Sequence, residues 1–204
     1  VEMDVGERPA LKAEHVNADV ANAVAATKRR SRFTVYRSDK SEQTAMQTVF
    51  QPIVEGVLNK NTFALCYGKP GAAKTFNLLD MGMCIALGKP WAGAYETVKG
   101  AVFYIAAEGG TSIHTRVAVA RKHHNAPDDT PFYLLPAAVD LVSNDGDAKE
   151  IVRLANAAAA RSELPLALIV VDTLNRSMGG GDENSGVDMG AFIKNVGHIM
   201  AETG

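Results

Sequence analysis

Hydrophobic and polar residues follow one another in blocks along most of the chain, and these blocks predict strands that alternate with helices. The apolar runs of strand length are Thr62–Tyr67, Ala101–Ala107, Phe132–Leu135 and Leu166–Val171. The stretches with helical character cover residues 74–87, 112–123, 147–161 and 187–203. Alternating strands and helices are typical of a parallel sheet with helices on both faces. We therefore expect an α/β fold, arranged as three αβα layers around a mainly parallel central sheet.

Residues 1–50 differ from the rest because their apolar residues are sparse and show no period. Such a segment lacks the apolar surface needed for a core of its own. We predict an N-terminal arm or linker over 1–50, with a short helix near Ala18–Arg30, and a core domain over 51–204. The basic cluster Lys28–Arg32 is either solvated or a contact to nucleic acid. Because the chain begins at Val1 and stops directly after a helical pattern, we expect a fragment that is incomplete at its C-terminus.

Composition narrows the class of protein. The 204 residues are 47% hydrophobic, which suffices for one sizeable core. A net charge of -2 gives no overall attraction to nucleic acid, so DNA contacts would need a local patch. The two cysteines belong to no Cys/His cluster, which favours buried free thiols in a reducing compartment. With no membrane-spanning apolar stretch or signal segment, we expect a soluble cytoplasmic protein without a membrane partner.

A glycine-rich turn joins the first apolar run to the first helix and has the composition of a phosphate-binding loop. Backbone N–H groups in such a turn, and at the helix N-terminus, converge on negative charge. Lys74 would reach the β- and γ-phosphates of ATP, where it also serves catalysis, and the Thr75 hydroxyl would bind Mg²⁺. The alternative is a turn without a ligand. The predicted nucleotide-binding residues are Gly68, Lys69, Pro70, Gly71, Ala72, Ala73, Lys74, Thr75 and Phe76.

Ala73 departs from the phosphate-loop pattern because it occupies the place of the glycine before the lysine. If the backbone φ is positive there, alanine costs on the order of 1 kcal/mol, and its methyl group would crowd the β-phosphate. The expected consequence is a weakened affinity for nucleotide.

Two acidic residues end predicted strands, at the sheet edge where open α/β folds bind ligands. Asp172 follows the aliphatic run Leu166–Val171 and fits the role of a Walker-B aspartate that binds Mg²⁺; the alternative is a cap or turn residue. Thr173 follows it, so the adjacent glutamate of many ATPases is missing. Glu108 is our candidate for the catalytic residue that polarises the attacking water, with a solvated loop glutamate as the alternative.

Other polar residues leave two interpretations open. Arg116, Arg121 and Arg176 either approach phosphate or a neighbouring subunit, or they pair locally. His123–His124 has no ligand-spaced partner nearby in sequence, which favours a polar helix end over a metal site. The loop Gly179–Gly186 either orders over a ligand or is a flexible crossover.

Four features together resemble the RecA-like ATPases related to plasmid RepA-type hexameric helicases: Gly68–Thr75, Gly88–Trp91, Val102–Gly109, and Val170–Leu174 with the later Asp182–Asn184. The resemblance covers roughly residues 53–204. It implies a RecA-like P-loop fold and ATP hydrolysis with Mg²⁺ in a motor for DNA replication, recombination or repair. DNA and further copies of the full-length chain are the implied partners. It also implies Lys74 and Thr75 at phosphate and magnesium, Glu108 as catalytic glutamate and Asp172 as Walker-B aspartate.

The family continues with another core strand, a polar sensor, and basic residues that serve a neighbouring subunit or DNA, none of which this chain contains. Without that strand, we expect an exposed sheet edge beside the phosphate-loop strand. Two other functions stay open. One is a regulatory or assembly module that binds nucleotide with little turnover, and the other is a RecA-like kinase or signalling ATPase without a nucleic-acid role.

Overall fold

The computed structural model describes residues 35–47, 51–108 and 110–204. The chain divides into two units, residues 1–49 and 50–204. In the first unit, helix α2 (Ser38–Gln47) begins next to an ion pair between Arg37 and Asp39. The sequence pattern did not predict α2. The predicted helix near Ala18–Arg30 and the basic cluster Lys28–Arg32 lie outside the described residues.

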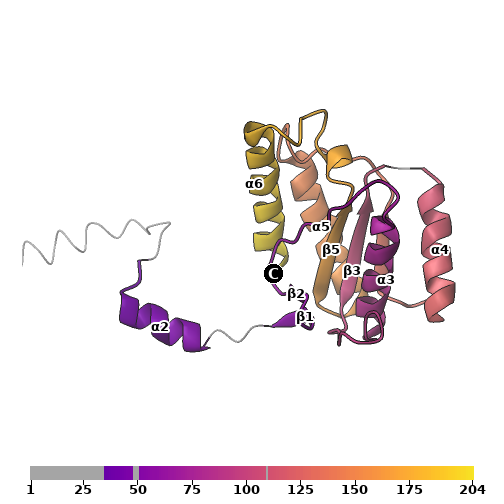
Figure 1. The fold of residues 1–204 in the computed structure, drawn as a ribbon, viewed down its shortest axis with the longest axis horizontal. Helices are drawn as coiled ribbons and strands as arrows, with labels where there is room; N and C mark the ends of the chain where they lie inside the picture. The colour runs from indigo at the N-terminus through magenta and orange to yellow at the C-terminus, as the bar shows by residue number, and fades with distance from the viewer. Residues whose placement is uncertain (1–34, 48–50, 109) are drawn as a thin grey trace, which may run out of the picture. The chain divides into compact units, whose positions relative to one another are not determined.

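The second unit is an α/β structure in which strands and helices alternate (Figure 1). From α3 onward, its α-helices and strands lie within one residue of the predicted positions. A short antiparallel hairpin precedes them and was not predicted. The elements are β1 (Pro52–Val54), β2 (Leu58–Asn59), α3 (Lys74–Leu87), β3 (Ala101–Ala106), α4 (Ser112–His124), β4 (Phe132–Leu135), α5 (Gly146–Ser162), β5 (Leu166–Asp172), the 3₁₀ helix η1 (Asn175–Ser177) and α6 (Gly186–Thr203).

The three main strands form a parallel sheet in the order β4-β3-β5. The chain steps from β3 to β4 through α4, and then crosses back past β3 to β5 through α5. Because crossovers between parallel strands are right-handed, this reversal of direction places α4 and α5 on opposite faces. The packing agrees: Tyr104 of β3 packs in a cluster with Leu79 of α3 and Ile113 of α4, and Phe103 packs with residues of α5 and α6.

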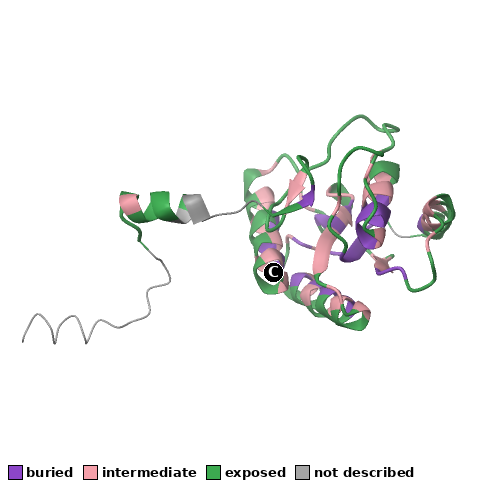
Figure 2. Ribbon diagram, turned by 90° about the horizontal axis from the view of Figure 1, so that it is seen from below, coloured by how far each residue is buried: buried purple, intermediate pink, exposed green. Residues whose placement is uncertain are grey.

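Strand β3 lies at the centre of the core, and all six of its residues are buried (Figure 2). Helix α3 packs so closely on the sheet that a Cβ atom at Gly82 would lie 2.9 Å from the Phe132 ring. On the other face, the buried Asn195 amide donates hydrogen bonds of 2.9 Å to the carbonyls of Leu141 and Asn144. These contacts hold one helix on each face of the sheet.

The predicted strand Thr62–Tyr67 is not a strand in the structure, and this prediction was wrong. The segment is irregular and exposed, with Tyr67 87% accessible. A strand needs a neighbour for its hydrogen-bond ladder, and here a hollow of about 860 Å³ is lined by both this segment and β5. For the same reason Cys66 is exposed, so only Cys84 is the buried thiol that the sequence predicted.

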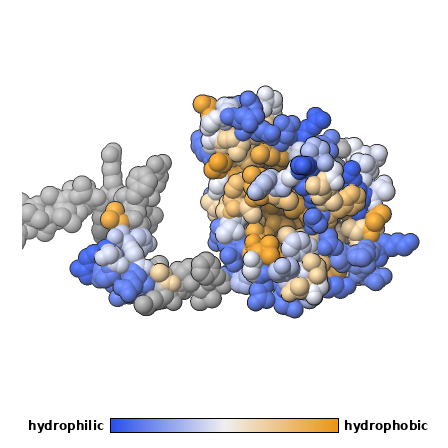
Figure 3. Space-filling model, in the orientation of Figure 1, coloured by the Kyte–Doolittle hydropathy of each residue, from blue (hydrophilic) through white to orange (hydrophobic). Residues whose placement is uncertain are grey.

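Strand β5 pairs with β3 along one edge only, among the described strands. Five of its seven residues are half-buried rather than buried. An apolar surface, orange in Figure 3, is visible in the region between α6 and α3. The expected exposed sheet edge is therefore present, but it faces a hollow instead of the phosphate-loop strand. None of the described helices has the length and hydrophobicity to cross a bilayer.

Candidate functional site

The crevice at the carboxyl ends of β3 and β5 is where this topology places a ligand. These neighbouring strands lead to helices on opposite faces, α4 and α6, and such a switch point leaves room between the departing loops. Ala106 lies opposite Asp172 in the parallel register, and the Ala107 N–H donates to the Asp172 carbonyl at 2.7 Å. Glu108 follows directly. The two predicted acidic residues thus come to the same edge of the sheet.

Asp172 is held by a tyrosine from the neighbouring strand. The Tyr104 hydroxyl donates a 2.6 Å hydrogen bond to Asp172 Oδ2, and the aspartate is only 8% exposed. Burial first, and then the Asp172 carboxylate, raise the pKa of Tyr104 far above its usual range, so the hydroxyl keeps its proton and donates. Sequence reasoning missed Tyr104 as a site residue. The available signal was a tyrosine inside an aliphatic strand, because a buried hydroxyl requires a partner.

The change Tyr104→Phe is expected to lower the free energy of unfolding by about 2 kcal/mol, because the buried carboxylate loses a donor. On the prediction that Asp172 binds Mg²⁺, the change is also expected to raise several-fold the Mg²⁺ concentration needed for half-maximal ATP binding, since the carboxylate loses its orientation. Urea unfolding and magnesium titrations measure these effects. Tyr133→Phe is the matched control, because Tyr133 packs with the cluster on the opposite face of the sheet. Equal effects in both variants would contradict a positioning role for Tyr104.

In the glycine-rich turn, the Lys74 side chain folds back onto backbone carbonyls of the turn. Lys74 begins α3, and its Nζ donates to the carbonyls of Gly68 at 2.8 Å and Lys69 at 3.2 Å. Gly71 has a φ of 79°, and no side chain caps the N-terminus of α3. The first N–H groups of a helix have no partner within the helix, so an uncapped N-terminus beside an ammonium group fits a phosphate. Thr75 is half-buried in the first turn.

Ala73 has the positive φ on which its predicted cost depended, with φ 57° and ψ 25° at the N-terminus of α3. Ala73→Gly is therefore expected to stabilise the fold by about 1 kcal/mol and to tighten ATP binding about fivefold, as the methyl group leaves the phosphate region. Thermal unfolding and ATP titration measure the two effects. Ala92→Gly is the matched control because Ala92 also has a positive φ, of 51°. Ala92→Gly should increase the stability of the fold without changing ATP affinity. If Ala73→Gly also leaves ATP affinity unchanged, the Ala73 methyl group does not crowd the phosphate.

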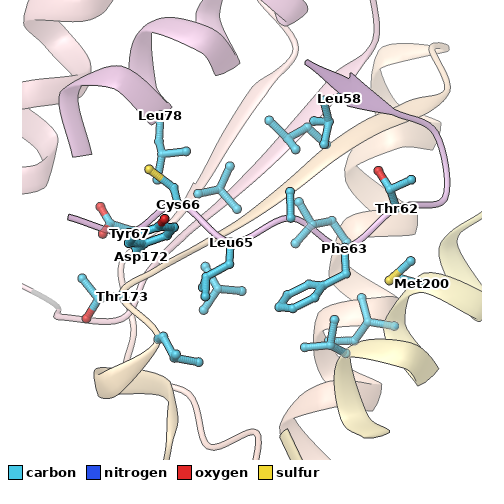
Figure 4. Close-up of a pocket in the computed structure, with 18 of the residues that line it drawn as sticks. Leu58, Thr62, Phe63, Leu65, Cys66, Tyr67, Leu78, Asp172, Thr173 and Met200 are labelled. Carbon is cyan, nitrogen blue, oxygen red and sulfur yellow. The ribbon is translucent and has the colours of Figure 1, made fainter. Parts of the chain in front are cut away.

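One end of the hollow brings the loop and the magnesium candidate together. Gly68, Pro70 and Lys74 line it with Asp172 and Asn184. Figure 4 shows Phe63 and Leu65 pointing from the irregular segment into the apolar remainder of this hollow. The polar candidate residues therefore line the same hollow as these apolar side chains.

Seven predicted site residues are not among those that line the hollow: Lys69, Gly71, Ala72, Ala73, Thr75, Phe76 and Glu108. Thr75 is half-buried in the first turn of α3, and Glu108 is exposed beyond the end of β3. Phe76 is 53% exposed, and the Arg116 guanidinium lies 5.6 Å from the centroid of its ring. Arg116 thus makes a cation–π contact with an aromatic side chain. This is a local contact, one of the two alternatives that the sequence left open for Arg116.

The glycine-rich loop before α6 is held by its own polar side chains. Ser185 caps the helix by accepting from the Asp188 N–H, and the Asp188 carboxylate accepts from the Asp182 N–H at 2.9 Å. The Asn184 N–H donates to Asp182 Oδ1, also at 2.9 Å. These bonds fix the part of the loop that contributes Asn184 to the hollow.

A parallel sheet, a glycine-rich turn before a helix, and an aspartate at a strand end are compatible with a P-loop nucleotide-binding protein. A family model described as an AAA domain matches residues 27–204, and since this is most of the chain, the chain belongs to the AAA domain family. This membership indicates nucleotide binding and ATPase activity; AAA domains generally bind ATP with Mg²⁺ and often oligomerise. Neither the search of curated proteins nor that of solved structures finds a match.

Proposed function

We propose that this chain binds ATP and Mg²⁺ at Gly68–Thr75 and hydrolyses the γ-phosphate, as the RecA-like core of a DNA-dependent motor. One observation carries the proposal: the Lys74 ammonium lies at the loop carbonyls, 2.8 Å from that of Gly68, and lines the same hollow as the buried Asp172. A cation at an uncapped helix N-terminus, lining the same hollow as a buried carboxylate, suits a phosphate bound together with a metal ion.

The proposed binding residues form two groups, one that would contact the phosphate oxygens and one that would hold the metal ion. Phosphate oxygens would replace the two carbonyls as acceptors for Lys74 Nζ, and the N–H groups at the start of α3 would donate to the same oxygens. Thr75 and Asp172 are the residues that would hold Mg²⁺, which when bound neutralises charge that develops on the phosphates. Tyr104 keeps Asp172 in place through its 2.6 Å hydrogen bond.

Glu108 is the proposed base for the attacking water. Its position two residues beyond Ala106 puts it at the edge of the sheet where Asp172 ends the adjacent strand. It is exposed, so a water molecule can reach its carboxylate. As the base, Glu108 would hold that water in line with the γ-phosphate.

The role in DNA replication, recombination or repair is supported by the resemblance of four sequence segments to RepA-type helicases. The test is the rate of ATP turnover with and without single-stranded DNA, with Glu108→Gln as the inactive reference. A motor core of this kind should turn over ATP faster with DNA. If the rate exceeds that of the reference but does not change with DNA, the chain is an ATPase and the proposed DNA role is contradicted.

The backbone at Ala73 also favours a second function, a nucleotide-binding regulatory or assembly module with little turnover. Its positive φ puts a methyl group where the motif has none. This function predicts ATP binding with a rate of phosphate release equal to that of Lys74→Ala, a variant expected to lose ATP binding. A parent rate clearly above that of the variant would exclude it.

A further inference from the structure

Three metal-ligating side chains meet between α3 and α4, outside the proposed nucleotide site. Asp80 and Cys84 lie four residues apart on α3, and His124 is the last residue of α4. Their ligand atoms all lie within 4.8 Å of one another, and His124 Nε2 is 2.7 Å from Asp80 Oδ1. Spacing along the sequence did not show this group, because two of its members come from a helix that precedes the histidine by 40 residues or more.

We propose that Asp80, Cys84 and His124 bind a divalent transition-metal ion, with Zn²⁺ as the best match, and leave one coordination position for water. Carboxylate oxygen, thiolate sulfur and imidazole nitrogen are all ligands that zinc takes, and mixed sulfur and nitrogen donors select against Mg²⁺ and Ca²⁺. Residues at i and i+4 share one face of a helix, so α3 can supply two ligands and α4 the third.

The charge and burial of the group suit such an ion. A carboxylate and a thiolate carry two negative charges, which a divalent cation balances. Cys84 is 2% exposed and the His124 side chain 13%, whereas the Asp80 side chain is 38% exposed. One buried donor and two partly buried donors give a site that is shielded yet open on one side. A hollow of about 250 Å³, lined by Asp80, His123 and His124, supplies the access route.

The surroundings position the histidine and set the protonation state without metal. Lys89 Nζ donates to the His124 carbonyl at 2.8 Å, which holds the end of α4 against the end of α3. Burial, and next the Asp80 carboxylate, raise the pKa of the Cys84 thiol to about 11. The metal-free protein therefore holds a neutral thiol, and a bound ion takes the place of its proton.

A metal ion at this site would link the two helices that follow the functional loops. Helix α3 begins with Lys74 of the phosphate loop, and α4 follows Glu108. The site lies elsewhere in α3 and uses none of the proposed nucleotide ligands. Metal binding can therefore be tested without ATP, and its outcome is independent of the proposed function.

The experiment is a titration of the whole chain, without nucleotide, with Zn²⁺ in competition with a chromophoric chelator and with Co²⁺ followed by absorption. We expect one equivalent of metal, with the intense visible bands of tetrahedral Co²⁺ and a thiolate charge-transfer band. Cys84→Ala and His124→Gln should each weaken binding by about 100-fold or more, since even outer-shell changes cost up to that much. Asp80→Asn should weaken it also.

Matched controls separate this site from adventitious binding. Cys66→Ser removes the exposed thiol of the irregular segment, and His123→Gln removes the histidine next to His124; both should bind as the parent does. If Cys84→Ala fails to fold by circular dichroism, the other two ligand variants decide. The proposal is overturned if the parent binds no metal, if the three ligand variants bind as tightly as the parent, or if His123→Gln or Cys66→Ser abolishes binding.

Discussion

Glu108→Gln is expected to lower ATP turnover by about a thousandfold, while ATP affinity stays within about twofold of the parent. Glutamine keeps the size and polarity of the side chain but cannot accept a proton from water, and a positioned base contributes roughly 10²–10⁴ in rate. Since Glu108 is exposed beyond the end of β3, the change leaves the buried core untouched. Steady-state phosphate release and ATP titration measure the two quantities separately.

Glu183 provides the control for this assignment because it is a glutamate that, unlike Glu108, lines the hollow with Asp172. Glu183→Gln should keep turnover within about twofold of the parent, since only one group serves as the base. Turnover that survives in Glu108→Gln and is lost in Glu183→Gln would move the role of the base to Glu183.

Lys74→Ala is expected to weaken ATP binding by about 100-fold or more. Charge-assisted hydrogen bonds contribute roughly 1.5–3 kcal/mol each, and Lys74 is placed to make such bonds to phosphate oxygens. The variant also loses the bonds to the Gly68 and Lys69 carbonyls, so circular dichroism must show an intact fold. Equilibrium binding of a fluorescent ATP analogue measures the loss, and Lys60→Ala, in the exposed turn after β2, is the control. A Lys74→Ala affinity equal to that of Lys60→Ala would contradict the role.

The helices and core strands could be predicted because their signals are local. Helix α3 ends at Leu87, as predicted, and Gly88 caps it, since a φ of 65° is a conformation that glycine adopts without strain. Strand β5 could be predicted because six consecutive aliphatic residues end at an acid. The hairpin β1–β2 could not, because strands of three and two residues carry no measurable period.

Features that depend on distant partners escaped prediction. Thr62–Tyr67 has strand-like composition, but whether it forms a strand depends on a neighbour that the pattern of its own residues does not supply. Tyr104 and Asp172 are 68 residues apart, and His124 is 44 from Asp80, so neither pair appears in any local motif. At Ala73 the sequence left the sign of φ open, and the structure supplies it, with a φ of 57°.

A calorimetric titration of ATP with Mg²⁺ into the parent chain, beside Lys74→Ala, tests the central claim most directly. The account predicts one binding event per chain that requires Mg²⁺ and disappears in the variant. Heat of binding that is the same in both proteins, or none in the parent, would contradict the claim that Gly68–Thr75 and Asp172 form a nucleotide site.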